Sequence, residues 1–178
     1  CYEHGVPGKL WVSLSPNRIS DGKEPVSLIT LEDTRFLHCN IKTLNLIPSV
    51  IASQKAKDAG ADEAVLYRPG ELVTECAHSN VHILKDGVLK THPADNLILG
   101  GIARAHLLRA CAALSVPTDE TAFTLTELFD ADEVIVTSSS NLCIRAEKID
   151  GKPVGGKAPE LFERLRSYLI DEFLTETA

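Results

Sequence analysis

Lys42 is the first residue of this sequence whose type and setting could support chemistry. It lies in the stretch CNIKTLNL, residues 39–46, in a short β-like run that precedes a helical segment with Pro48 near its start. Alternation along a strand places Lys42 on the face opposite Ile41 and Thr43, where it can point into a cleft. A partly desolvated lysine is a nucleophile toward carbonyl groups, whereas a lysine whose charge stays in water is an ordinary surface residue. Taken alone, Lys42 is compatible with both interpretations.

Glu75 is the second candidate, near the end of a strand-like run in LVTECAHSN, residues 72–80. A carboxylate in this position can be a solvated strand end. It can also be a fixed anion, which a pyridinium ring nitrogen needs in order to stay protonated while the ring draws off carbanion charge. The presence of a candidate nucleophilic lysine favours the second interpretation.

Two further stretches have the character of anion-binding segments. LGGIAR, residues 99–104, places glycines at the start of a helix, where free backbone N–H groups and the positive helix end favour a phosphate. VTSSSN, residues 136–141, supplies three hydroxyls after a buried strand. The glycines can instead serve only a chain turn, and the serines only a turn cap. Together, a nucleophilic lysine, an acid for a ring nitrogen and two sets of phosphate donors describe a pyridoxal phosphate site.

The elements that must position these residues are mixed strands and helices, so the sequence predicts an α/β or α+β fold without internal repeats. Asp-Gly pairs at 86–87 and 150–151 mark two hairpin turns. Strands are expected at residues 9–14, 25–33, 63–68, 72–76, 80–91 (a hairpin), 132–140 and 143–154 (a hairpin). Helices are expected at residues 46–59, 100–114, 124–131 and 159–174.

Composition excludes several other classes of function. A net charge of -7 without a cluster of Lys and Arg argues against a nucleic-acid partner, which requires a concentrated basic surface. The five cysteines are scattered and form no CxxC pair, so neither a disulfide framework nor a metal site is expected, and a reducing cytoplasm is favoured. No apolar run is long enough to cross a bilayer, and the first residues lack the pattern of a signal peptide. We therefore expect a soluble, cytoplasmic protein.

Four stretches resemble a known family in both order and spacing: NIKTLNLIPSVIASQKAKDAGADEAVL, VTECAHSNVHILKDG, HPADNLILGGIAR and DEVIVTSSSN. They are similar to the class IV, fold type IV aminotransferases that depend on pyridoxal phosphate, and they look most like D-amino acid (D-alanine) aminotransferases. Branched-chain aminotransferases and aminodeoxychorismate lyases share the scaffold. The resemblance implies the large C-terminal domain of that fold, a mixed sheet or pseudo-barrel with flanking helices.

The resemblance also implies roles for individual residues. Lys42 would be the Schiff-base lysine and the acid/base group, and Glu75 the partner of the pyridine nitrogen. The remaining cofactor contacts would be Leu99 against the ring, backbone N–H groups of Ile102 and Ala103 and donors from Ser138 and Ser139 for the phosphate, His78, Ser79 and Asn80 along the pocket wall, and Arg35 near the phosphate. The sequence departs from the family at Ala103, where relatives often carry threonine, and at ECAHSN, which replaces a glycine-serine-serine run.

The resemblance further implies a domain organisation. Residues 1–17 would be the remnant of a small N-terminal domain, 18–23 a linker, and 24–178 the large domain that binds pyridoxal phosphate. The expected reaction is D-alanine plus 2-oxoglutarate to pyruvate plus D-glutamate, in a homodimer. In relatives the small domain traps the substrate carboxylate, so three alternatives stay open: an aminodeoxychorismate lyase, a branched-chain aminotransferase, or an inactive cofactor-binding fragment.

Overall fold

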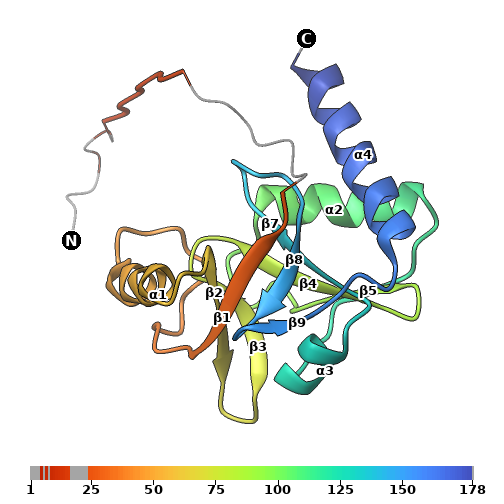
Figure 1. The fold of residues 1–178 in the computed structure, drawn as a ribbon. Coiled ribbons are helices and arrows are strands. Elements are labelled where there is room, and N and C mark those ends of the chain that lie inside the picture. The colour runs from red at the N-terminus through yellow and green to blue at the C-terminus, as the bar shows by residue number, and fades with distance from the viewer. Residues whose placement is uncertain (1–4, 6, 8, 17–23, 178) are drawn as a thin grey trace.

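The computed structural model describes residues 5, 7, 9–16 and 24–177. The strands are β1 (Val26–Glu32), β2 (Glu63–Arg68), β3 (Leu72–Cys76), β4 (Asn80–Lys85), β5 (Val88–Thr91), β6 (Thr118–Asp119), β7 (Glu133–Thr137), β8 (Ile144–Ile149) and β9 (Lys152–Pro153). The helices are α1 (Ile47–Asp58), α2 (Ile102–Ala113), α3 (Leu125–Asp130) and α4 (Pro159–Glu176). The mixed α/β class is therefore as predicted (Figure 1).

The nine strands of the described residues belong to one sheet, in the order β3-β2-β1-β8-β7-β4-β5-β6, with β9 paired to β8. β1 is parallel to both β2 and β8, whereas β7 is antiparallel to both β4 and β8. In a flat sheet β3 and β4 would lie five strand spacings apart, about 24 Å. Only residues 77–79 connect them, and four Cα steps span at most about 14 Å. The sheet must therefore curl, which agrees with the predicted pseudo-barrel.

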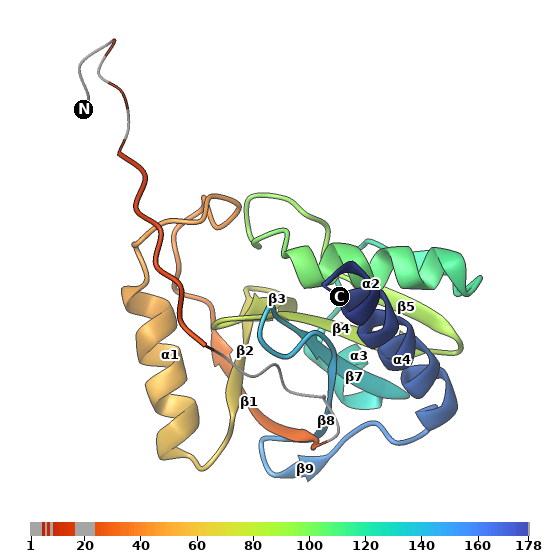
Figure 2. The ribbon, with the colours of Figure 1, turned by 90° about the horizontal axis from the view of Figure 1, so that it is seen from above.

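The strands near the centre of the sheet are buried on both faces. Along β7, Val134 and Val136 belong to the apolar cluster on one face and Ile135 to the cluster on the other. The first cluster includes Phe123 and Leu128, beside α3. The second contains the apolar sides of α2 and α4, and a third, smaller cluster lies under α1. Figure 2 shows α1 at one side of the sheet and α2 with α4 at the other.

Two expected strands are not formed. Residues 9–16 have no strand partner in the described part of the chain, and Leu10, Trp11, Val12 and Leu14 are exposed. A strand is stable only when a neighbour satisfies its backbone groups, so apolar alternation alone does not make one. The β-like run that was expected around Lys42 is also not formed, because residues 41–46 are a loop that leads into α1. The predicted linker, 18–23, lies outside the described residues.

The remaining predicted elements are confirmed, several to the residue. β2 and β3 coincide with the expected ranges, and both Asp-Gly pairs form hairpin turns in which each residue has positive φ. α1 has Pro48 in its first turn and is followed by Gly60 with φ +73°. None of the helices in the described residues is long and apolar enough to cross a membrane.

Candidate active site

A cavity of about 590 Å³ lies between the loop before α1, the β3–β4 turn and the start of α2. All of the predicted site residues except Ser138 line it: Arg35, Lys42, Glu75, His78, Ser79, Asn80, Leu99, Ile102, Ala103 and Ser139. These residues come from five separate parts of the sequence, and the fold brings them together around one cavity.

Lys42 reaches this cavity from a loop rather than from a strand. Its side chain is exposed, as are those of Ile41 and Leu44, so the loop has no buried face opposite the lysine. The alternation argument for an inward-pointing Lys42 is therefore wrong, although the residue does line the cavity. A loop lysine is free to turn toward a bound molecule.

Glu75 is buried in β3 and is held from three directions. Its Oε1 accepts a hydrogen bond from Nη1 of Arg35, and its Oε2 accepts one from Nδ2 of Asn80 at 2.9 Å. The backbone N–H of Leu99 lies 3.1 Å from both carboxylate oxygens. Burial raises the pKa of Glu75 to about 7, against the lowering effect of Arg35 and of the Leu99 N–H. The carboxyl group therefore changes charge near neutral pH.

Arg35 contacts Glu75 as part of a buried charge network that sequence reasoning missed. The guanidinium also donates to both oxygens of Asp33, at 2.9 and 2.8 Å, and to the carbonyl of Leu97 at 3.1 Å. Nε of Arg68 lies 3.4 Å from Oδ2 of Asp33, an oxygen that Arg35 also contacts. Burial acts to raise the pKa of Asp33, but the hydrogen bonds and charge of Arg35 outweigh it and lower that pKa. The short spacing of Asp33 and Arg35 at the end of β1 was the available sequence signal for this network.

The start of α2 forms another wall of the cavity. Gly101 is the N-cap residue, and no side chain caps the helix there. The first N–H groups of a helix have no partner within it, so those of Ile102 and Ala103 are available to a ligand. Ile102 is 72% exposed, and Leu99 is half-buried just before the helix.

His78 and Ser79 lie in the β3–β4 turn, beside α1 and the start of β2. The His78 ring is 3.0 Å from the hydroxyl of Ser53 and 3.6 Å from the carboxylate of Glu63. Ser79 donates to the same carboxylate at 3.3 Å. Both residues therefore form part of the cavity wall while their side chains are tied to neighbouring elements.

Ser138 is the predicted site residue that the cavity does not include. It lines a neighbouring hollow of about 260 Å³, together with Ser140 and Asn141. Its hydroxyl lies 3.2 Å from that of Ser140 and accepts from the backbone N–H of Asn141 at 3.3 Å. The hydroxyl is therefore used within its own loop, and Ser139 is the serine of this loop that lines the cavity.

Thr137 also lines the cavity and was not predicted. Its hydroxyl lies 2.9 Å from Nε2 of His82, whose Nδ1 lies 2.8 Å from the hydroxyl of Thr91. Burial, with a smaller effect of Arg104, lowers the pKa of His82 to about 3, so this imidazole is neutral. No local pattern in the sequence indicates this arrangement, because it joins three strands.

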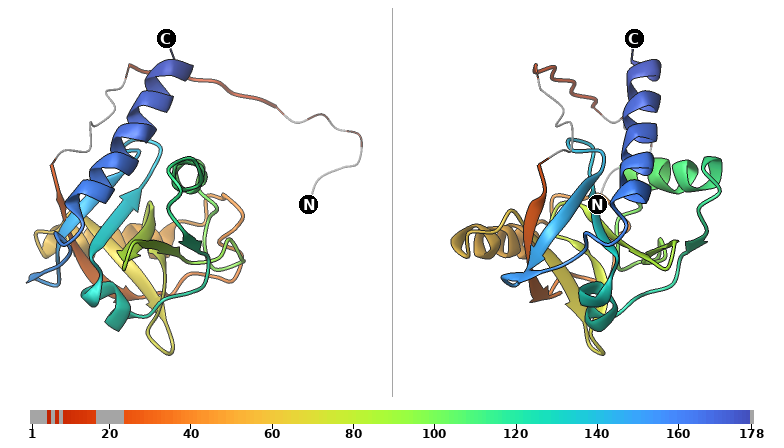
Figure 3. Two further views of the ribbon diagram at one scale, coloured as in Figure 1. Left: turned by 90° about the vertical axis from the view of Figure 1, so that its right-hand side faces the viewer. Right: turned by 45° about the vertical axis from the view of Figure 1, so that its right-hand side comes forward.

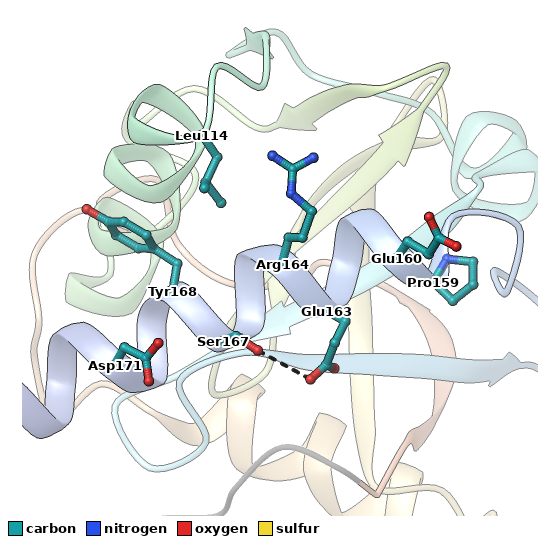
Figure 4. A pocket seen from close by; sticks show the side chains of 8 residues that line it. All are labelled: Leu114, Pro159, Glu160, Glu163, Arg164, Ser167, Tyr168 and Asp171. Atoms are coloured by element: carbon teal, nitrogen blue, oxygen red, sulfur yellow. Dashed lines mark hydrogen bonds between the residues drawn. The ribbon is translucent and has the colours of Figure 1, made fainter.

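A larger hollow, of about 690 Å³, lies between the end of α2 and one side of α4 (Figure 4). None of the predicted site residues lines it. Ser167 donates to Glu163 at 3.3 Å within the helix, and the Tyr168 and Leu114 side chains lie on the α2 side of the hollow. The predicted site residues other than Ser138 lie instead around the 590 Å³ cavity, so we take that cavity as the candidate active site.

Comparison with known proteins identifies the family of the chain. The model of the family "Amino-transferase class IV" matches residues 4–149. The D-alanine aminotransferase of Listeria monocytogenes serotype 4b is 45% identical over 148 residues, which are 83% of this chain and 51% of that protein. That of Bacillus licheniformis is 44% identical over 154 residues, which are 86% of this chain and 54% of that protein. The chain belongs to the class IV aminotransferases, whose cofactor is pyridoxal phosphate.

Solved structures give the same fold. The fold IV transaminase CpuTA1 of Curtobacterium pusillum has a TM-score of 0.75 at 24% identity and covers 85% of this chain and 54% of that one. A branched-chain aminotransferase of the thermophilic archaeon Thermoproteus uzoniensis has a TM-score of 0.70 at 25% identity. The match covers 85% of this chain and 52% of that one. The predicted family and fold are therefore confirmed. The chain spans about half the length of the curated relatives it matches.

Proposed function

We propose that this chain carries the cofactor-binding and proton-transfer residues of a D-amino acid aminotransferase. The reaction is the transfer of the amino group of D-alanine to 2-oxoglutarate, which yields pyruvate and D-glutamate. The observation that carries the proposal is the presence of Lys42, Glu75 and the uncapped start of α2 around one cavity. The relatives at 44–45% identity are D-alanine aminotransferases, whereas branched-chain enzymes are 23–28% identical and an aminodeoxychorismate lyase is 24% identical, which favours the D-alanine reaction.

The residues of the cavity fit pyridoxal phosphate at both ends. At one end, the buried carboxylate of Glu75 is suited to a protonated ring nitrogen. At the other, free N–H groups and the positive end of α2 are suited to a phosphate. When bound, the cofactor supplies an aldehyde that bonds an amine and a ring that accepts electron density. Ile102, Ala103 and Ser139 would hold the phosphate, with Leu99 beside the ring and His78 and Ser79 along the wall.

Lys42 is the residue that moves protons in this proposal. Its Nζ would hold the cofactor by the aldehyde carbon when no substrate is bound. As a free amine it would take the proton from the substrate Cα and deliver it to the cofactor carbon C4′, as a general base and acid. Its place on an exposed loop supports this role, because the amine must occupy two positions during one turnover.

Arg35 acts on Glu75 in this proposal, rather than on the phosphate as the resemblance implied. Its hydrogen bonds go to Glu75, Asp33 and the Leu97 carbonyl, which lie at the carboxylate end of the cavity. The positive guanidinium favours the ionised form of Glu75 and so offsets the effect of burial. A fixed anion at the ring nitrogen therefore depends on Arg35.

We also propose the organisation and surroundings of the protein. Residues 24–178 form the cofactor domain, 18–23 a linker, and 1–17 the end of a small domain. A homodimer is supported by apolar side chains that are exposed on α1 and the loop before it, namely Ile41, Leu44, Leu46, Ile47, Val50 and Ile51. A cytoplasmic location is supported by Cys39, Cys76, Cys111 and Cys143, which are unpaired.

The test is a covalent mapping experiment on the purified chain. Pyridoxal phosphate is added, the visible absorbance is recorded, and the product is reduced with borohydride and digested for peptide mass mapping. We expect a yellow species and a single adduct on the Lys42 peptide. Lys42→Ala should abolish both, whereas Lys57→Ala, on the exposed side of α1, should leave them intact. Adducts scattered over surface lysines would reject the proposal. Pyruvate formation from D-alanine and 2-oxoglutarate then tests the substrates.

A further inference from the structure

Asn80 joins the two ends of the proposed cofactor site. It is the first residue of β4, is buried, and follows the tight β3–β4 turn. Both hydrogens of its amide are used: Nδ2 donates to Oε2 of Glu75 at 2.9 Å and to the carbonyl of Leu99 at 2.8 Å. One side chain therefore contacts the carboxylate of β3 and the backbone segment that leads into α2.

The contacts form a closed set of three residues. Leu99 donates its backbone N–H to Glu75 and accepts from Asn80 through its carbonyl, so its position is fixed from both sides. Because α2 begins at Ile102, three residues further on, the position of Leu99 also sets where the helix N-terminus lies. The separation between Glu75 and the helix N-terminus is thus held by the Asn80 amide together with the Leu99 N–H.

Gly101 leaves the space that this amide occupies. Its φ is -65°, a value that any residue adopts, so glycine is not needed for backbone conformation. A Cβ atom at this position would instead lie 2.2 Å from Oδ1 of Asn80. Asn80 cannot rotate away without losing its bonds to Glu75 and Leu99, because both come from the same amide. The absence of a side chain at 101 and the amide at 80 therefore depend on each other.

We propose that Asn80 is a positioning residue that sets the span between Glu75 and the start of α2, and that Gly101 is required because Asn80 occupies the space of its side chain. The inference rests on the proposed function, since the span matters only for a ligand that reaches both ends. Pyridoxal phosphate does so through its ring nitrogen and its phosphate. Pyridoxal, which lacks the phosphate, makes use of the Glu75 end alone.

The experiment compares the affinities of the chain for pyridoxal phosphate and for pyridoxal, by visible absorbance titration. In Asn80→Ala we expect pyridoxal phosphate to bind about tenfold more weakly, and the ratio of the two affinities to fall toward one. General loss of structure would weaken both ligands alike and leave the ratio unchanged. Asn96→Ala is the matched control, because that amide donates to the Leu37 carbonyl at 2.9 Å and lines no part of the cavity.

A double-mutant cycle tests the pairing with Gly101. Gly101→Ala alone should lower the affinity ratio as Asn80→Ala does, because the added methyl group displaces the amide. In the Asn80→Ala background the same methyl group meets its next neighbour, Cβ of Arg104, at 3.9 Å, so it should add little. If Asn80→Ala does not fold, Gly101→Ala still tests the positioning role, through its effect on the ratio of the affinities for pyridoxal phosphate and pyridoxal.

The outcomes separate the two levels of inference. A wild-type chain that binds pyridoxal phosphate, together with variants of unchanged affinity ratio, overturns the positioning role alone. Additive effects of the two substitutions overturn the pairing of Asn80 with Gly101. A wild-type chain that binds neither ligand overturns the proposed function, and the positioning role with it.

Discussion

Glu75 is a residue whose charge state makes the stability of the folded chain depend on pH. Its pKa of about 7 in the folded chain lies above the ordinary value of 4.5, because burial penalises the carboxylate. Between these two values the folded state holds a proton that the unfolded state has released. The contribution of Glu75 to stability is therefore present at low pH and is lost as pH rises from about 4.5 to about 7.

The first prediction follows from this decrease in stability with rising pH. Glu75→Gln removes the titration, so the variant should lose less stability relative to wild type at pH 8 than at pH 5. The measurement is urea denaturation of the cofactor-free chain at both pH values, analysed as a difference in free energy of unfolding. A difference that stays constant, or grows with pH, contradicts the placement of Glu75 in a desolvated site.

Arg35 provides a second prediction at the same scale. Arg35→Met leaves Glu75 buried without its cation and Asp33 with Arg68 alone, which should cost about 3–5 kcal/mol in free energy of unfolding. The control is Arg109→Met, which removes an exposed ion pair with Glu172 and should cost at most about 1 kcal/mol. Equal costs in denaturant titrations would show that the Arg35 network is not buried as described.

The residues of the site were predictable to different degrees. Lys42 and Glu75 stand in motifs whose residue types fit the chemistry, and both line the cavity. The spacing of Asp33 and Arg35 was a local signal for their ion pair, but its link to Glu75 and the close approach of Asn80 to Gly101 were not predictable. No local pattern records that residues 35, 75 and 99 meet. Their proximity is a product of the curled sheet. A hydrogen bond between distant segments leaves no periodic signal in the sequence.

Among the elements, the two hairpins depend most clearly on individual residues. At the β4–β5 turn, Asp86 and Gly87 have φ values of 50° and 76°. This conformation matches the twist of the two strands, but only glycine adopts positive φ without strain. The same pattern recurs at Asp150 and Gly151, with φ values of 50° and 73°.

Gly87→Ala should therefore destabilise the chain by about 1 kcal/mol, through backbone strain alone, since no atom lies within 4 Å of the added Cβ. Gly100→Ala is the matched control for stability, because Gly100 lacks positive φ and its Cβ would meet Ala94 at an ordinary 3.8 Å. Thermal unfolding of the two variants checks this. Equal shifts in Tm would contradict the strained-turn account.

Element prediction succeeded where a local pattern and a strand partner coincide. β2, β3 and both hairpins show this, whereas residues 9–16 and 41–46 have a strand-like composition without a paired neighbour in the described chain. β6, of only two residues, was missed because its pairing to β5 depends on the return of the chain after α2. Composition shows that a strand can form, and tertiary contacts decide whether it does.

At the scale of the whole molecule, the described surface carries exposed apolar side chains in particular regions. Apolar side chains are exposed around the start of α1, and the C-terminal end of α4 stands clear of the sheet (Figure 3). An exposed apolar surface of this kind is typical of an interface. The proposed homodimer would cover it.

We expect sedimentation equilibrium of the chain to show reversible dimers at micromolar concentration. Ile47→Lys, at an apolar position that is 70% exposed, should raise the dimer dissociation constant by at least about tenfold. Lys57→Ala, near the other end of α1, should have no effect. A monomeric wild-type chain would reject the homodimer.

The curl of the sheet also has a consequence for the order in which the chain folds. The β4–β5 hairpin joins neighbours in sequence, whereas the hydrogen bond from Thr30 to Asp150, beside the β1–β8 pairing, joins residues 120 positions apart. Contacts between distant residues carry the larger loop-closure entropy and form slowly. Since the cavity takes Arg35 from the segment after β1 and Ser139 from the segment before β8, it is complete only once such distant segments have paired. Refolding followed by pyridoxal phosphate absorbance should therefore lag behind secondary structure.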